Sequence, residues 1–422
     1  MLSTRLYPIE GQLRSSLTRL LAISKGRNLS TVAGDSWESQ FTRAIQSTVD
    51  FQRDINEVSY LESSERLRSL LRSGLLRHTD LVTHPERFFL AHRILAKHAT
   101  KIGPGFWVRF TVHYNLCMGS ILGLGSDEQV SLLDEFQEKG LLGCFSLTEK
   151  FAGVNSGMVV NTIAEYMPNR DSFVIRTPNE GAKKNWISQG LCADKSVVVA
   201  DLRMGNKSFG PHAFLIDLRK DGNLTPGVTV GDMGRKTVGN DLDNAWIAFD
   251  AVEVPKSSLL NRFADIENGQ YVQKVKGMPV FHMIGQRLFT GRVAVAQAAH
   301  EFRQSLFKTT RRYTDDKRVW SPSGEEVVLS DIPQVKALFE EESEKGRELA
   351  AFLAKCEAEL SSTLKSNQLP SIELVQAIAA AKVRASEESI LLCHRLRNEV
   401  GSFALMHGNG FEQTDFLQVL HY

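Results

Sequence analysis

One short stretch of the chain, GCFSLTEKFAGVNSG at residues 143–157, combines small residues, hydroxyl groups and glycines in a way that could bind a ligand. Gly153 and Gly157 would allow close approach to the backbone, because glycine has no Cβ. Backbone N–H groups and the hydroxyls of Ser146 and Thr148 could then bond a planar ligand rich in hydrogen-bonding atoms. Composition alone, however, favours an ordinary turn at this place.

The motifs of several other site classes are absent from the sequence. There is no GxSxG, no HExxH and no Cys/His cluster at zinc spacing, so no motif indicates a hydrolase nucleophile or a metal site. There is no GxGxxG after a strand either, and Gly408-Asn409-Gly410 lacks the third glycine of a dinucleotide-binding motif. The five cysteines are odd in number and widely spaced, which favours buried thiols in a reducing compartment: Cys117, Cys144, Cys192, Cys356 and Cys393.

The composition is that of a soluble globular protein. The chain has 422 residues, of which 42% are hydrophobic and 23% charged, and a length of this kind suggests two to four structural units. Fifty basic residues against 49 acidic ones give a net charge of +1, so no global field indicates binding to nucleic acid or to an anionic membrane. No apolar run approaches the ~18–20 residues that a membrane span needs.

Residues 1–34 have the composition of an organelle transit segment. They carry five basic residues against the single acid Glu10, together with frequent serine and threonine: Arg5, Arg14, Arg19, Lys25 and Arg27. This predicts a mitochondrial location, with an ordinary first helix as the alternative. The chain ends Leu420-His421-Tyr422, which is not an SKL-type peroxisomal signal.

The hydrophobic pattern predicts an α+β fold in the order helices, sheet, helices. Residues 35–142 are helical in pattern, 143–255 consist of short β-branched runs separated by turn signals, and 280–422 are helical again. Because no helices fit between the central runs, we expect a small antiparallel sheet domain between an N-terminal helical domain and a C-terminal helical bundle.

The stretch at 143–157 also resembles the flavin loop of the acyl-CoA oxidase and acyl-CoA dehydrogenase superfamily, an aromatic-x-x-Thr-Glu motif followed by a glycine-containing turn. Three later segments resemble the same superfamily in the same order: SFVIRTPNEGAKKNWISQGL at 172–191, a segment within 213–262 that is closest to the oxidase branch, and GSFALMHGNGF at 401–411. The resemblance covers roughly residues 60–422. It implies the acyl-CoA dehydrogenase-like fold and an FAD-dependent conversion of fatty acyl-CoA to trans-2-enoyl-CoA in fatty acid β-oxidation, with the peroxisome as the alternative location.

The resemblance also implies roles for individual residues. Thr148 would bond the flavin ring, Trp186 would pack along it, and Ser188 would donate to its edge near N5, although serine here leans toward the dehydrogenase branch. Asn155 matches a polar substrate-binding position. Four further residues match contacts to the FAD of a neighbouring subunit, which implies a homodimer or homotetramer: Lys317, Arg318, Gly408 and Gly410.

The family's catalytic glutamate is not found in this sequence. It usually follows the segment matched by Asp415 to Tyr422, so we expect the chain to be truncated at its C-terminus and assign no catalytic residue. Glu149 looks structural, and Glu301 is only a weak candidate for the base. Three interpretations remain open: an acyl-CoA oxidase that reduces O₂, a dehydrogenase that passes electrons to an electron-transfer flavoprotein, and a catalytically silent FAD- or acyl-CoA-binding protein.

Overall fold

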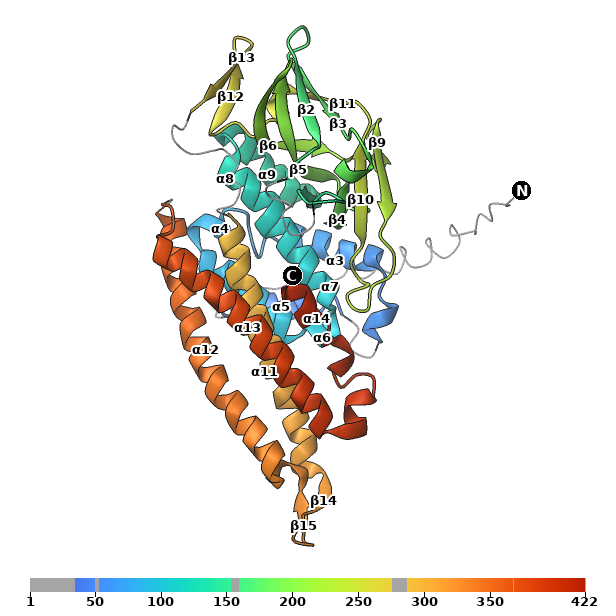
Figure 1. The fold of residues 1–422 in the computed structure, drawn as a ribbon, viewed down its shortest axis with the longest axis vertical. Coiled ribbons are helices and arrows are strands. Elements are labelled where there is room, and N and C mark those ends of the chain that lie inside the picture. The colour runs from blue at the N-terminus through green and yellow to red at the C-terminus, as the bar shows by residue number, and fades with distance from the viewer. Residues whose placement is uncertain (1–34, 50–52, 153–158, 275–286, 367, 422) are drawn as a thin grey trace, which may run out of the picture.

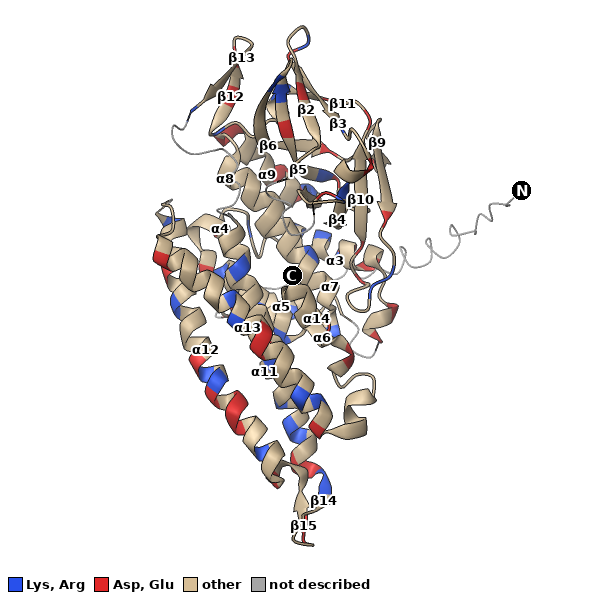
Figure 2. Cartoon of the chain, viewed as in Figure 1, with Lys and Arg blue, Asp and Glu red and all other residues tan. Residues whose placement is uncertain are grey.

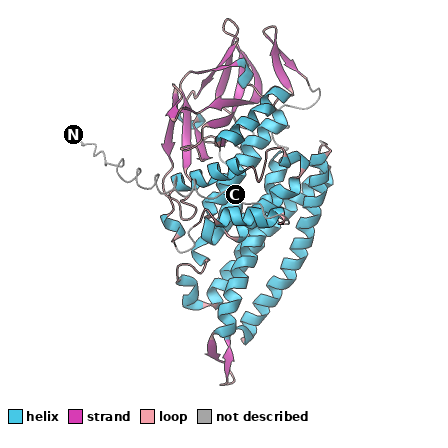
Figure 3. Cartoon of the chain, turned by 180° about the vertical axis from the view of Figure 1, so that it is seen from behind, coloured by secondary structure: helices cyan, strands magenta, loops and turns pink. Residues whose placement is uncertain are grey.

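The computed structural model describes residues 35–49, 53–152, 159–274, 287–366 and 368–421. Within these ranges the chain runs from helices through strands to helices again, which confirms the predicted α+β class. Most strands gather at one end of an elongated molecule, helices fill most of the rest, and one short hairpin of strands lies at the opposite end (Figures 1 and 3).

The first part of the chain is helical because apolar residues recur at helical spacing between clear capping signals. Ser59 begins α3 with a capping box, in which its hydroxyl accepts from the N–H of Glu62 while its own N–H donates to the Glu62 carboxylate. Gly74 ends the helix in the left-handed conformation. The helices are α2 (Trp37–Gln46), α3 (Tyr60–Ser73), α4 (Asp80–Thr83), α5 (Pro85–Lys97), α6 (Ala99–Ile102), α7 (Pro104–Thr111), the π-helical turn η2 (Val112–Met118), α8 (Gly119–Leu124) and α9 (Asp127–Lys139), with a 3₁₀ turn at Ile55–Glu57.

The central part contains a six-stranded sheet and a three-stranded sheet. The larger sheet contains β1 (Gly143–Ser146), β2 (Ile163–Met167), β3 (Ser172–Arg176), β5 (Lys195–Met204), β6 (Lys207–Asp217) and β11 (Val252–Pro255). The smaller sheet has the order β4 (Lys184–Ser188), β10 (Asn244–Phe249), β9 (Val228–Asp232). Two hairpins complete this part: β7 (Arg219–Lys220) with β8 (Asn223–Leu224), and β12 (Ala264–Glu267) with β13 (Gln270–Gln273).

The expectation of a purely antiparallel sheet was wrong. Strand β5 pairs antiparallel with β6, but it pairs parallel with β1 along Lys195–Val198 and with β2 along Asp201–Arg203. Side chains of β5 alternate between two cores, since Val197 and Val199 pack with the helical core and Val198 packs within the β core. Helices therefore cover one face of this sheet, and a parallel pairing needs such a cover.

The last part is a bundle of long helices. Helices α11 (Arg287–Asp316), α12 (Pro333–Lys365) and α13 (Ile372–Glu399) pack along one another, and α14 (Phe416–His421) packs on α13. The predicted apolar stripe of α13 is buried: Leu374, Ile378, Ala381, Ala385 and Leu392. A hairpin of β14 (Arg318–Trp320) and β15 (Glu326–Val328) joins α11 to α12 at the end of the molecule opposite the sheets (Figure 1).

Charge is mixed along the helices in the view of Figure 2, where basic and acidic residues are interspersed along α12. Among the described helices, none combines the length and apolarity required to cross a bilayer. All five cysteines are buried and unpaired, as the sequence predicted.

Candidate functional site

Thr148 lies directly beside β4, because the chain after β1 continues as an antiparallel partner of that strand. The N–H of Asn185 donates to the Thr148 carbonyl at 2.9 Å, and the N–H of Lys150 donates to the Lys183 carbonyl at 2.9 Å. Thr148 itself is partly buried. This pairing brings the threonine of the 143–157 stretch next to the strand that carries Trp186 and Ser188.

Trp186 occupies a bulge in β4. The register of β4 against β10 shifts between Ala245 and Ile247, and Trp186 has a φ of 55°, which is rare for a residue with a large side chain. The indole is 55% exposed instead of buried in the core. A strained backbone that holds a large aromatic ring in the open is a feature of binding sites.

Ser188 follows two residues later and is partly buried. Its hydroxyl accepts from the Asn244 side-chain amide at 3.2 Å, across the β4–β10 pair. The structure thus brings Thr148, Trp186 and Ser188 onto two neighbouring segments of backbone.

Phe151 is an exposed aromatic residue that no sequence motif indicated. Its ring is 78% exposed, and a Cβ placed on Gly181 would come within 2.5 Å of it. A threonine hydroxyl, an indole and a phenyl ring in one short region match the chemistry of a planar aromatic heterocycle that also forms hydrogen bonds. The residues present therefore fit an isoalloxazine ring.

A buried ion pair fixes the Thr148 segment to β4. The Lys184 ammonium lies 3.0 Å from the Glu149 carboxylate, both side chains are fully buried, and the ammonium also donates to the carbonyls of Leu147 and Val199. The carboxylate accepts from the backbone N–H groups of Asn161 and Thr162 as well. Burial alone raises the pKa of Glu149, but the Lys184 charge and these N–H groups outweigh it and hold the pKa below its ordinary value. Glu149 is therefore an ionised structural anchor.

Lys317 and Arg318 do not lie beside Thr148, Trp186 and Ser188. Asn155 lies outside the described residues. Lys317 and Arg318 are exposed at the β14–β15 hairpin, at the far end of the molecule from β4 (Figure 1). Within one chain they are not brought to Thr148.

Gly408 and Gly410 lie in a turn between two 3₁₀ helices, Gly401–Leu405 and Phe411–Gln413, and not within a helix as their surroundings suggested. Both have positive φ, 88° and 93°. Their N–H groups donate to the Glu412 carboxylate at 2.8 and 3.0 Å, which shows that this turn presents donors to an anionic group. Gly410 packs on α6 and α11, so the turn belongs to the helical part of the chain.

Glu301 lines a cavity of about 1040 Å³ between α5, α11 and α12. Burial raises the pKa of this carboxyl group. No residue of β1, β4 or the 148–152 segment lines the cavity, so Glu301 does not face the candidate site. A smaller cavity of about 400 Å³ lies beside β4, lined by Lys150, Lys183, Asn185 and Trp246 among others. No group of three or more His, Cys, Asp or Glu residues in the described ranges could hold a metal ion.

Comparisons with known proteins give a consistent relationship. No protein-family model matches the chain. It is 33% identical over 272 residues to the acyl-coenzyme A oxidase of Kluyveromyces lactis, an alignment covering 62% of this chain and 35% of the relative. It is 31% identical over 226 residues to peroxisomal acyl-coenzyme A oxidase 3 of Homo sapiens, an alignment covering 52% of this chain and 32% of the human protein. The chain thus spans about a third of the length of these relatives.

Solved structures share the fold. An acyl-CoA oxidase-2 structure from Caenorhabditis elegans, bound with FAD, ascaroside-CoA and ATP, superposes with a TM-score of 0.75 and 22% identity over 92% of this chain and 59% of that one. The butyryl-CoA dehydrogenase of Megasphaera elsdenii gives a TM-score of 0.69 and 18% identity over 92% and 94%. These structures identify the acyl-CoA dehydrogenase-like architecture.

Proposed function

We propose, from the premise that this chain is a homologue of the acyl-CoA oxidases with an acyl-CoA dehydrogenase-like fold, that it binds FAD and takes part in the oxidation of fatty acyl-CoA. The observation that carries the proposal is the exposed indole of Trp186, held on a strained bulge beside Thr148.

The isoalloxazine would bind against the segments that carry Thr148, Trp186 and Ser188. Thr148 would offer its hydroxyl or its N–H group to the ring, Trp186 would cover part of a ring face, and Ser188 would donate to the edge near N5. Lys317, Arg318, Gly408 and Gly410 would contact the FAD of a neighbouring subunit. The distance of β14, which begins at Arg318, from β4 within one chain is consistent with a homodimer or homotetramer, which we include in the proposal.

The proposed reaction removes one hydrogen each from Cα and Cβ of a fatty acyl-CoA and yields a trans-2-enoyl-CoA. Bound FAD would supply the hydride-accepting chemistry. The part of the chain described here would orient the ring through Thr148 and Ser188 and shield it from water with Trp186. O₂ would be the electron acceptor of an oxidase, and an electron-transfer flavoprotein that of a dehydrogenase.

A second candidate function is a catalytically silent FAD- or acyl-CoA-binding protein. It is favoured by the state of the carboxylates: Glu149 is saturated with hydrogen bonds, and Glu301 lines a different cavity. A general base typically contributes ~10²–10⁴-fold, so a site without one would bind its ligands and turn over little.

The cofactor proposal is tested by titrating the purified protein with FAD. We expect saturable binding that Thr148→Ala and Trp186→Ala weaken, since each removes a direct contact to the ring. A protein that stays colourless and binds no added FAD contradicts the proposal.

Anaerobic mixing with a fatty acyl-CoA separates the enzyme from the silent binder. Bleaching of the flavin absorbance supports the enzyme, and unchanged absorbance with retained FAD supports the binder. Hydrogen peroxide formed in air then identifies an oxidase, whereas dye-dependent turnover without peroxide identifies a dehydrogenase.

For the location, the peroxisome replaces the mitochondrion as our proposal. The relatives include oxidases named as peroxisomal, and none of the comparisons supports the mitochondrial prediction from residues 1–34. Co-localisation of the full chain with a peroxisomal or a mitochondrial marker decides between the two.

A further inference from the structure

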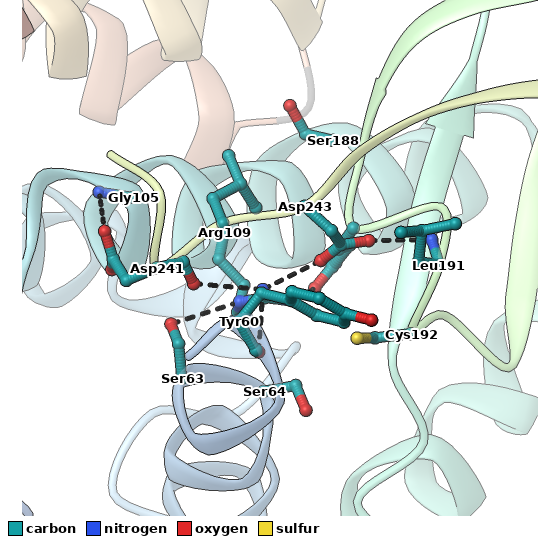
Figure 4. A network of polar contacts seen from close by, with 12 residues as sticks. Tyr60, Ser63, Ser64, Gly105, Arg109, Ser188, Leu191, Cys192, Asp241 and Asp243 are labelled. Carbon is teal, nitrogen blue, oxygen red and sulfur yellow. Dashed lines mark hydrogen bonds and ion pairs between the residues drawn. The ribbon is translucent and has the colours of Figure 1, made fainter. Parts of the chain in front are cut away.

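A second buried ion pair lies where the first helices meet the strands, close to Ser188 but outside the residues that would touch FAD. Arg109 on α7 and Asp243, just before β10, are both fully buried, and their charged groups are 2.9 Å apart (Figure 4). Two isolated charges in this position would be costly, so the surrounding hydrogen bonds decide what the pair does.

The Arg109 guanidinium joins three parts of the chain. It donates to the Ser63 hydroxyl and the Tyr60 carbonyl of α3, to the Asp241 carbonyl, and to the Gln189 side-chain oxygen at 3.4 Å. Arginine suits such a role because its donors form a rigid planar fork. Helices α3 and α7 are thereby connected to the backbone that follows β4.

Asp243 also bonds the backbone that follows β4, through both its carboxylate and its carbonyl group. The second carboxylate oxygen accepts from the N–H of Leu191 at 2.7 Å, and the Asp243 carbonyl accepts from the N–H of Gln189 at 2.9 Å. The Gln189 side chain also donates to the Gly143 carbonyl of β1 at 2.5 Å. Residues 189–191 are therefore fixed to β1, to Asp243 and, through Arg109, to α3.

This fixation matters because the backbone around Ser188 is strained on both sides. Trp186 and Gln189 have φ values of 55° and 56°, and residues in this region are held in place only when their surroundings over-determine them. Asn244, adjacent to Asp243, donates to the Ser188 hydroxyl. Figure 4 shows the Ser188 side chain directed away from the Arg109 cluster.

Close packing limits how far this junction can relax. Asp241 accepts from the N–H of Gly105 at 3.0 Å, and a Cβ on Gly103 or Gly105 would come within 2.3 or 2.4 Å of its carboxylate. The helix start at Pro104 is thus pressed against the loop that carries Asp241 and Asp243. Because this junction is rigid, the position of α7 determines the position of the backbone that follows β4.

From this geometry we infer that Arg109 and Asp243 are positioning residues for the flavin site: they hold the strained backbone on either side of Ser188 in the conformation that presents the Ser188 hydroxyl to the isoalloxazine. The inference rests on the proposed function, because it needs a flavin in that place. It differs from a purely stabilising role, since it predicts that the ion pair acts on FAD through Ser188.

The experiment is a double-mutant cycle on FAD affinity with Asp243→Asn and Ser188→Ala. Asp243→Asn keeps the shape of the side chain but removes its charge, and we expect roughly tenfold weaker FAD binding and an altered visible circular dichroism of the bound flavin. In the Ser188→Ala background Asp243→Asn should change FAD affinity little further, because the two residues act on one contact. Ser188→Thr, which keeps a hydroxyl, should preserve the sensitivity to Asp243→Asn.

The matched control is Glu342→Gln, the same kind of change beside the buried Arg303 in the helical bundle. It should leave FAD affinity and the flavin spectrum unchanged. If Asp243→Asn does not fold, Arg109→Lys replaces it in the cycle, since lysine keeps a positive charge beside Asp243 but lacks the planar fork of donors that reaches Gln189.

FAD binding by Asp243→Asn, or by Arg109→Lys in its place, that equals wild type would overturn the inference while leaving the proposed function intact. Losses that add fully to those of Ser188→Ala would do the same. A wild-type protein that binds no FAD contradicts the proposed function itself, and the inference with it.

Discussion

Two buried charge clusters in this molecule are built differently. In the strand region, Glu149 and Lys184 use their hydrogen-bonding capacity on each other and on backbone groups of several segments. In the helical bundle, Arg303 lies 3.3 Å from Glu342 and 3.9 Å from Glu388, yet two of its guanidinium nitrogens make no hydrogen bond. The first cluster fixes a backbone geometry, whereas the second links side chains of α11, α12 and α13.

This difference indicates where the molecule needs one defined conformation. A fully satisfied polar network specifies a unique arrangement, while a partly satisfied one adds little to specificity. Both the Glu149–Lys184 pair and the Arg109–Asp243 pair adjoin the segments that carry Thr148, Trp186 and Ser188. Substitutions at one cluster at a time should therefore have different effects on stability and on FAD binding.

The largest effect is expected from Lys184→Met. It leaves the Glu149 carboxylate buried without its counter-charge, which should lower the free energy of unfolding by about 3–5 kcal/mol and weaken FAD binding. Urea unfolding measures the first effect and FAD titration the second. Adding Glu149→Gln to Lys184→Met should restore part of the stability; a double variant less stable than Lys184→Met alone would contradict this account.

Arg303→Met should lower the free energy of unfolding by less, about 1–3 kcal/mol, and should leave FAD affinity unchanged. Burial raises the pKa of Glu342, so this carboxyl can take up a proton once its partner is gone. The same urea series compares the two variants directly. If Arg303→Met lowers the free energy of unfolding more than Lys184→Met does, the cluster around Arg303, and not the Glu149–Lys184 pair, is the one that fixes the conformation.

The pH dependence of stability should have opposite signs at the two glutamates. The lowered pKa of Glu149 gives stability that is present above pH 4.5 and is lost as the pH falls below it, whereas the raised pKa of Glu342 gives stability that is present below pH 4.5 and is lost as the pH rises. Subtracting the curves of Glu149→Gln and Glu342→Gln from wild type over roughly pH 3 to 7 isolates each contribution. If the contributions of Glu149 and Glu342 to stability change with pH in the same direction, the contrast between the two carboxyl groups is wrong.

The smallest change in stability is expected from Trp186→Gly. Glycine relieves the positive φ while the lost indole was largely exposed, so stability should stay within about 1 kcal/mol of wild type as FAD affinity falls. Gln189→Gly relieves a similar φ but also removes the contacts to Gly143 and Arg109, and should destabilise by about 1–3 kcal/mol. Equal effects of the two substitutions on stability would contradict the proposal that Trp186 binds the flavin while Gln189 holds the backbone in place.

The fold class could be predicted from the sequence because helix and strand periodicities are local. Val197–Val199 and Phe214–Ile216 lie in strands as their β-branched and apolar character suggested. The parallel pairings of β5 could not be predicted, since they join segments distant in the chain. The prediction of Thr148, Trp186 and Ser188 as site residues came from the family resemblance and not from composition.

The supporting residues were missed for a physical reason. Arg109 stands in the apolar run FWVRFTVH, and a lone charge in such a run is a signal for a buried, paired side chain, but its partner Asp243 is more than a hundred residues away. The bulge at Trp186 depends on the register against β10, which no local pattern reveals. Lys317 and Arg318 could be placed at a helix end, but their proposed ligand belongs to a neighbouring subunit.

The most direct test of the account is the FAD titration of wild-type protein alongside Trp186→Gly, with folding checked on both samples. The account predicts that wild type binds FAD with the visible absorption of a flavoprotein, and that Trp186→Gly remains folded and loses most of that affinity. A folded wild-type protein that binds no FAD, or equal binding by both proteins, would contradict it.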